Sequence, residues 1–138
     1  MSVECFLDTN VLVYAVSALA GDAHKKARAL DLVRAADFGI SSQVLQEFYV
    51  TVTRKIQKPL APDTAVSLLE AYRLFPIAQT DYPLILTAIE HSLRHGISYW
   101  DGAIVAAAEA LDAPVLYTED LSHERRYGTV QVINPFLM

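Results

Sequence analysis

Short apolar runs alternate with longer amphipathic segments along the chain, and this alternation constrains the fold more than any other feature. The runs that predict buried strands cover residues 3–7, 38–40, 75–78, 115–117 and 130–133. The segments that predict helices cover residues 10–16, 23–36, about 42–57 and 63–74, with two more around 85–93 and 100–111. Strands that alternate with helices favour a three-layer α/β/α sandwich with a mainly parallel central sheet. The chain has 138 residues and no linker-like stretch, so we expect a single domain over residues 1–138.

Local signals predict how several helices begin, end and pack. Asp22 is expected to cap the helix over residues 23–36, and Ser41 or Ser42 the helix that follows the second strand. Gly96 is expected to close the helix around residues 85–93. Two apolar stripes at helical spacing predict buried faces: residues 45, 48, 49, 52 and 56 in one helix, and residues 85, 88, 89 and 93 in another.

Composition excludes several classes of protein. The net charge of −5 argues against a simple electrostatic nucleic-acid binder, which usually carries a basic face. It does not exclude a nuclease, because bound cations offset the charge of metal-binding acids. The single cysteine, Cys5, cannot form an intramolecular disulfide and is expected to be a buried apolar side chain in a reducing compartment. Acidic residues interrupt the apolar N-terminal stretch and no basic segment precedes it, so we expect a cytoplasmic protein without a membrane span.

Four carboxylates are expected to meet at one edge of the sheet. Asp8 directly follows the first strand, and Asp120 comes just beyond the strand at residues 115–117. Glu47 lies early in a helix that leaves the strand at residues 38–40, and Asp101 begins a helix that returns through a short turn to the strand at residues 115–117. In parallel α/β sheets, ligands bind beyond the carboxyl ends of the strands. We therefore predict that these four side chains surround one cleft.

Each carboxylate also has an alternative structural role. Asp8 could cap the helix that follows it, and Asp101 stands three residues after Ser98, as in a capping box. Glu47 lies opposite the apolar stripe of its helix, which is typical of a solvated face. Asp120 lies in a loop, where acidic residues are common. Convergence of all four on one cleft favours a functional role over four independent structural ones.

Clustered carboxylates repel one another unless a cation lies between them. Oxygen ligands favour hard ions such as Mg²⁺ or Mn²⁺ over zinc, which prefers nitrogen and sulfur. Such ions bind substrate phosphates and support phosphodiester hydrolysis. We therefore expect a metal-dependent nuclease.

The motifs around these acids resemble those of PIN-domain ribonucleases, and in particular the VapC toxins of type II toxin–antitoxin systems. The matching stretches are FLDTNVL at residues 6–12, QEF at 46–48, YWDGAI at 99–104 and YTED at 117–120. Their order and spacing suit the family across essentially the whole chain. The resemblance implies an Mg²⁺- or Mn²⁺-dependent endoribonuclease that acts on RNA.

The resemblance also assigns roles to individual residues. It implies that Asp8, Glu47, Asp101 and Asp120 surround the metal, and that Asn10 and Thr118 are supporting polar residues. It further implies a homodimer and inhibition by a VapB-type antitoxin protein. Many relatives carry another acid two positions after the fourth one, where this chain has Ser122. We therefore consider whether Glu119 shares the metal-binding role, and place substrate or antitoxin contacts in the polar loop at residues 122–129.

Three other interpretations each fit part of the sequence. A haloacid-dehalogenase-like phosphohydrolase also begins with an aspartate at a strand end, but its phosphatase members usually have a second aspartate at the position of Asn10. A catalytically inactive PIN-like binding module would have lost one of the four acids. His91 and His95 have the i, i+4 spacing of zinc-binding histidines, but no third ligand is evident.

Aromatic side chains could stack on RNA bases. Tyr14, Trp100 and Tyr127 are the candidates for this role.

Overall fold

The computed structural model describes residues 2–137 and has a six-stranded sheet at its centre. The strand order across the sheet is β3-β2-β1-β4-β6-β5. Within residues 2–137 the neighbouring strands pair in parallel, except for β5 and β6, which are antiparallel. The mainly parallel sheet predicted from the sequence is therefore confirmed. The strands are β1 (Cys5–Leu7), β2 (Phe38–Ser41), β3 (Ile77–Ala78), β4 (Val115–Tyr117), β5 (Arg126–Tyr127) and β6 (Val130–Ile133).

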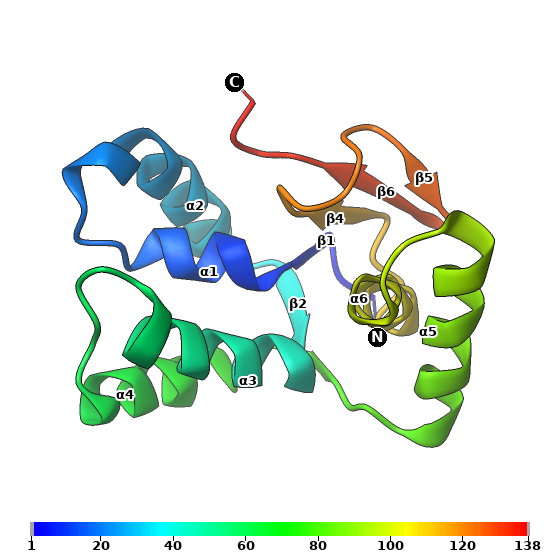
Figure 1. Cartoon of the computed structure of the whole chain (residues 1–138), viewed down its shortest axis with the longest axis horizontal. Coiled ribbons are helices and arrows are strands. Elements are labelled where there is room, and N and C mark those ends of the chain that lie inside the picture. Colours follow the sequence, from blue (N-terminus) through cyan, green and yellow to red (C-terminus); the bar gives the residue numbers. More distant parts are fainter. Residues whose placement is uncertain (1, 138) are drawn as a thin grey trace.

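Helices cover the sheet on both sides, which confirms the three-layer α/β arrangement. Figure 1 shows α1 to α4 on one side of the strands and α5 and α6 on the other. None of the helices described within residues 2–137 combines the length and the apolar character needed to cross a membrane. The helices are α1 (Thr9–Ala15), the 3-10 helix η1 (Ala20–Asp22), α2 (Ala23–Ala35), α3 (Ser42–Val50), the π-helix η2 (Thr51–Lys55), α4 (Pro62–Tyr72), α5 (Tyr82–His95) and α6 (Tyr99–Ala110).

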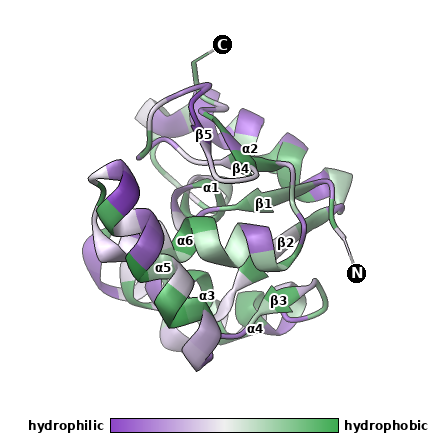
Figure 2. Ribbon diagram, turned by 90° about the vertical axis from the view of Figure 1, so that its right-hand side faces the viewer, coloured by the Kyte–Doolittle hydropathy of each residue, from purple (hydrophilic) through white to green (hydrophobic). Residues whose placement is uncertain are grey.

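The core includes the two central strands, α6, and the buried faces of α1 and α3. Phe6, Leu7 and Leu116 are fully buried in β1 and β4, and α6 is buried continuously from Gly102 to Ala108. Figure 2 shows these central segments mainly in the green of hydrophobic residues. Burial of each large apolar side chain contributes about 1.5–3 kcal/mol, so the strand ends that carry Asp8 and Thr118 are firmly held.

Helices α5 and α6 pack closely because α6 has a glycine at the contact. A Cβ added to Gly102 would collide with the carbonyl oxygen of Ala88 in α5 and would meet the amide nitrogen of Ser92 at 3.2 Å. Asp101 directly precedes this glycine in the first turn of α6. The close contact therefore also fixes the start of the helix that carries Asp101.

The buried face predicted for α5 is only partly correct. Ala88 is buried as predicted, but Ile89 and Leu93, which were expected in the same face, expose 40% and 80% of their surfaces. The helix also buries Leu84 and His91, which the predicted face did not include. His91 is tolerated there because its Nε2 atom lies 2.6 Å from Glu109 Oε1 of α6. A polar pair therefore replaces part of the expected apolar contact.

Helix ends agree with the sequence predictions in two cases and differ in one. Ser41 caps α3 by accepting a hydrogen bond from the Val44 N–H, and Gly96 closes α5 in the left-handed conformation, with φ of 65°. Asp22 precedes α2 but its side chain makes no capping hydrogen bond. Its carboxylate instead accepts a hydrogen bond of 2.6 Å from the Ser17 hydroxyl.

Three short elements were not predicted, and one of them is the 3-10 helix η1. The polar loop at residues 122–129 contains β5, a two-residue strand that pairs with β6. The helix expected to run to about residue 57 changes to a π-helix at Thr51 and ends at Lys55. Cys5 is half-buried, whereas a buried side chain was expected. Desolvation raises the pKa of its thiol to about 11, which favours the protonated thiol at neutral pH.

Candidate active site

Four separate elements carry the predicted acids to one cavity. Asp8 follows β1 directly, Glu47 lies in the second turn of α3, Asp101 lies in the first turn of α6, and Asp120 follows β4. All four line a cavity of about 640 Å³. The predicted convergence is therefore present, while the catalytic role of each residue stays a prediction.

The four carboxylates differ in their exposure to solvent. Asp8 is only 5% exposed, because it lies where β1 meets α1. Asp101 is half-buried, and Glu47 and Asp120 are exposed. The cavity therefore has a buried carboxylate at its base and solvent-exposed ones at its rim.

The Thr118 hydroxyl joins three parts of the site. It donates a hydrogen bond of 2.8 Å to Asp8 Oδ2, and it accepts hydrogen bonds of 3.1 Å from the Asn10 amide and from the Asp120 N–H. The Asn10 amide also donates to Asp120 Oδ2 at 3.1 Å. Because a hydroxyl has one donor and two acceptor sites, Thr118 uses its full hydrogen-bonding capacity here. Asn10 and Thr118 therefore contact two of the four acids, and the supporting role that the resemblance implies for them stays a prediction.

The capping roles of these acids coexist with their place in the cavity. Asp8 is the N-cap residue of α1, and its Oδ1 accepts a hydrogen bond of 2.7 Å from the Thr9 N–H. Ser98 caps α6 by accepting a hydrogen bond from the Asp101 N–H, which leaves the Asp101 carboxylate at the cavity. Glu47 is held by the Thr9 hydroxyl, which donates to its Oε1 at 3.0 Å.

The surroundings of the two least exposed acids favour their protonated forms. Burial raises the pKa of Asp8 to about 7; hydrogen bonds from Thr118 and Thr9 oppose the rise, and the charges of Asp120 and Glu47 add to it. Burial, together with the charge of Asp120, also raises the pKa of Asp101 above its ordinary value. A bound cation would reverse both effects by favouring the ionised carboxylates.

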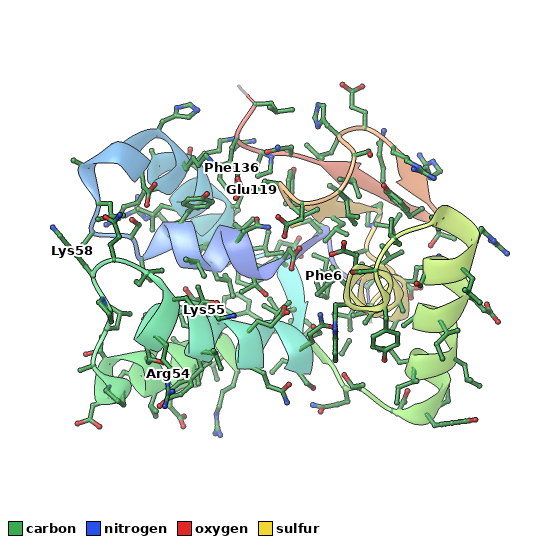
Figure 3. The ribbon with its side chains drawn as sticks, in the orientation of Figure 1. Phe6, Arg54, Lys55, Lys58, Glu119 and Phe136 are labelled. Carbon is green, nitrogen blue, oxygen red and sulfur yellow. The ribbon has the colours of Figure 1, made fainter. Side chains whose placement is uncertain are left out.

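Glu119 has partners that the sequence did not reveal. Its two carboxylate oxygens accept hydrogen bonds of 2.9 Å from the Tyr14 hydroxyl and from the Lys25 ammonium group. Lys25 Nζ also lies 4.7 Å and 5.6 Å from the ring centres of Tyr14 and Phe136. Figure 3 shows Glu119 and Phe136 close together above α1. Glu119 thus links the β4 end to α1 and α2, which contrasts with the metal-sharing role considered from the sequence.

The loop at residues 122–129, where substrate contacts were expected, does not line this cavity. The wall of the cavity is instead formed by residues from α1 to η1 and by residues of α3 and η2. Of the aromatic candidates for base stacking, Tyr127 is 1% exposed and lies in the core. Tyr14 and Trp100 line the cavity, and Trp100 is 63% exposed.

The donor set of the cavity fits a hard divalent cation. Its acids supply carboxylate oxygens, and within residues 2–137 the buried Asn10 Oδ1 atom has no hydrogen-bond partner. As they stand, the described residues include no group of three or more acidic, histidine or cysteine side chains arranged to hold an ion. Because Glu47 and Asp120 are exposed, their side chains can move closer to Asp8 without repacking of the core.

The family to which the chain belongs follows from a sequence match over most of its length. A model of the PIN domain family matches residues 5–128. This chain belongs to the PIN domain family. The matched range of the PIN domain includes all four acids of the cavity, together with Asn10 and Thr118.

Solved structures share the fold of this PIN domain. VapC20 of Mycobacterium tuberculosis, described as a sarcin–ricin loop cleaving toxin, has a TM-score of 0.67 and 21% identity, covering 84% of this chain and 89% of that one. A toxin–antitoxin complex from Klebsiella pneumoniae gives a TM-score of 0.69 at 17% identity, with coverage of 95% and 97%. DNA-bound VapBC from Salmonella typhimurium has a TM-score of 0.65 and 18% identity, covering 94% of this chain and 96% of that one. No curated protein sequence matches the chain.

Proposed function

We propose that this PIN domain is a metal-dependent endoribonuclease and the toxin of a toxin–antitoxin pair. One observation carries the proposal: four carboxylates from four separate elements line a single cavity at the carboxyl edge of the sheet. The similarity of the fold to a toxin described as cleaving an RNA loop supports RNA as the substrate class.

Asp8, Asp101 and Asp120 would hold the metal ion, with Glu47 completing its oxygen ligands. A bound Mg²⁺ or Mn²⁺ ion would polarise the scissile phosphodiester and stabilise charge on the leaving oxygen. Asp8 supplies a fixed position, because Thr118 and the Thr9 N–H hold its two oxygens. Asn10 and Thr118 hold the Asp120 segment beside Asp8, because the Asn10 amide donates to the Asp120 carboxylate and the Thr118 hydroxyl accepts from the Asp120 N–H.

The alternative activities fit less well. In a haloacid-dehalogenase-like phosphohydrolase Asp8 would attack phosphate, and a second acid would stand at the position of Asn10. Here Asn10 donates hydrogen bonds to Thr118 and Asp120 instead, and the family match is to the PIN domain. An inactive binding module would not need to keep all four carboxylates around the cavity.

Two protein partners belong to the same proposal: a VapB-type antitoxin and a second copy of this chain. The similar folds include a toxin–antitoxin complex and a DNA-bound VapBC complex, which supports an antitoxin partner here. Analytical ultracentrifugation of the purified chain should show a dimer. Monomers over the whole concentration range would contradict the dimer without affecting the nuclease proposal.

The proposed activity is tested by cleavage of structured RNA in Mg²⁺ or Mn²⁺. Asp8→Asn and Asp101→Asn should abolish cleavage while circular dichroism shows a folded protein. Asp31→Asn is a matched control, because Asp31 is an exposed carboxylate of α2 that does not line the cavity. Equal cleavage by Asp8→Asn and Asp31→Asn would refute the proposal, and so would wild-type protein that cleaves no structured RNA in either ion.

A further inference from the structure

The cavity that contains the acids also has a basic end. Lys55, the last residue of η2, and Lys58, in the turn that follows, line the same cavity as Asp8 and Asp101. Both lysines are exposed. Within residues 2–137, the ion pairs involve other basic residues, namely Lys25, Arg73, His91 and His123. The charges of Lys55 and Lys58 are therefore available to a molecule that enters the cavity.

The π-helix explains why Lys55 faces the cavity. Gln43, Glu47, Thr51 and Lys55 are spaced by four residues, and all line the cavity wall. In a regular α-helix each step of four residues overshoots one turn by about 40°, so such a row drifts around the helix. A π-helix has more residues per turn; the Ile56 N–H bonds to the Thr51 carbonyl, five residues back. The wider turn offsets the drift and keeps Lys55 in line with Glu47.

Arg54, the basic residue next to Lys55, points away from the cavity. Arg54 is exposed but does not line the cavity. Figure 3 shows Lys55 between α1 and α3, whereas Arg54 lies on the side toward α4. The turn that carries Lys58 is fixed to η2 by a hydrogen bond of 2.8 Å from the Leu60 N–H to the Val52 carbonyl. Lys55 and Lys58 are therefore held at one wall of the cavity.

The separation of the acidic and basic ends suits a polyanionic strand. Glu47 and Lys55 are eight residues apart, which corresponds to about 12 Å along a helix. Successive phosphates of a stacked strand are about 3.4 Å apart along its axis, so this span corresponds to about three or four nucleotides. Because the protein has a net charge of −5, its overall field repels RNA. Local cations must therefore hold a strand whose scissile phosphate lies among carboxylates.

We propose that Lys55 and Lys58 bind backbone phosphates of the RNA strand on one side of the scissile bond, and so set the direction in which the strand crosses the cavity. The inference rests on the proposed ribonuclease function and names the residues that position its substrate. The two lysines do not take part in bond cleavage. Their loss should weaken strand binding and raise KM while kcat stays the same.

The test measures binding separately from cleavage. A short fluorescein-labelled single-stranded oligoribonucleotide is titrated in EDTA with wild type, with K55Q/K58Q and with the control R54Q, at several salt concentrations. Each phosphate contact on a single strand contributes about 0.7 to the slope of log Kd against log salt. K55Q/K58Q should therefore lower the slope by about 1.4, whereas R54Q should leave it unchanged. Melting temperatures of all three proteins check that they are folded.

The outcomes separate this inference from the proposed function. Equal slopes and equal KM values for wild type and K55Q/K58Q would overturn the role of the lysines, even if RNA is cleaved. If K55Q/K58Q had a lower slope of log Kd against log salt but wild type cleaved no RNA, the result would support phosphate binding by the two lysines. It would refute the proposed nuclease activity. The inference would also be overturned if K55Q/K58Q bound RNA as tightly as wild type but no longer bound a labelled polyglutamate peptide. The basic end of the cavity would then be a site for an acidic protein segment.

Discussion

The Thr118 hydroxyl donates a hydrogen bond of 2.8 Å to the Asp8 carboxylate, across two adjacent parallel strands that each end at the cavity. Thr118 is completely buried and Asp8 is nearly so. The hydrogen bond holds the carboxylate in one orientation, and the same hydroxyl accepts a hydrogen bond from the Asn10 amide. The base of the site is therefore a connected set of polar groups inside an apolar core.

Thr118→Val should lower both stability and activity. The valine methyl group cannot donate to Asp8 or accept from Asn10, so buried polar groups lose their partner, at a cost of about 1–3 kcal/mol in free energy of unfolding. Loss of a residue that orients a metal ligand should reduce RNA cleavage by about 10–100-fold. Urea denaturation and initial cleavage rates measure the two effects. Thr118→Ser keeps the hydroxyl and should recover most of both; equal losses in the two variants would contradict the hydrogen-bonding role.

Asp8→Asn should stabilise the metal-free protein at high pH. Burial raises the pKa of Asp8 to about 7 in the folded protein, compared with its ordinary value of 3.8. The folded state therefore binds the proton more tightly than the unfolded state, and wild-type stability falls as the pH rises from about 4 to about 7. The difference corresponds to at most about 4 kcal/mol. Thermal melts in EDTA between pH 4 and 8 should show the two proteins diverging; parallel curves would contradict the raised pKa.

Divalent cations should stabilise the wild-type protein. Mg²⁺ or Mn²⁺ that binds the folded carboxylates raises the melting temperature, by an amount that grows with the ratio of ion concentration to Kd. Asp8→Asn should respond much less, because it lacks the buried ligand. Differential scanning fluorimetry with increasing Mn²⁺ provides the measurement. Equal increases for wild type and Asp8→Asn would show that the ion binds elsewhere.

Glu109→Gln should weaken the contact between α5 and α6. Burial tends to raise the pKa of Glu109, but hydrogen bonds from His91 and Thr129 outweigh it and hold the pKa below its ordinary value of 4.5. The carboxylate therefore contributes stability above about pH 4.5, and this contribution is lost as the pH falls through the lower pKa of the folded protein. At pH 7 the variant should lose about 1.5–3 kcal/mol of free energy of unfolding, as for other hydrogen bonds to charged groups. A difference that persists unchanged at pH 3 would contradict this explanation.

Strand order along the chain and the position of Asp8 and Asp120 at strand ends were enough to predict the sheet and its acidic edge. The buried face of α5 could be predicted only in part, at Ala88, because apolar residues lie on more than one side of the helix and only packing on α6 selects Leu84 over Ile89 and Leu93. The two-residue strand β5 is too short to show alternation. The π-helix depends on a shift in backbone hydrogen bonds that leaves no mark in the apolar stripe.

The hydrogen-bond partners of individual side chains could not be predicted from the sequence either. Asp22 has the residue type and the position of a helix cap, yet its carboxylate accepts a hydrogen bond from the Ser17 hydroxyl and does not cap α2. Glu119 stands beside Asp120, yet its pairing with Lys25 depends on how α2 folds back over α1. Ser17 lies only five residues before Asp22, whereas Lys25 and Glu119 are 94 residues apart. In both cases the partner is set by how the backbone folds, which the capping pattern and the acidic pair do not show.

Gly102 brings no reactive group to the cavity, yet the close packing of α6 on α5 depends on it. A methyl group there would push the first turn of α6 away from Ala88 and move the neighbouring Asp101. A random-mutagenesis screen for inactive variants should therefore recover Gly102→Ala alongside changes to the acids themselves. Pseudorevertants of that variant should map to α5, where a smaller or shifted contact would let Asp101 return.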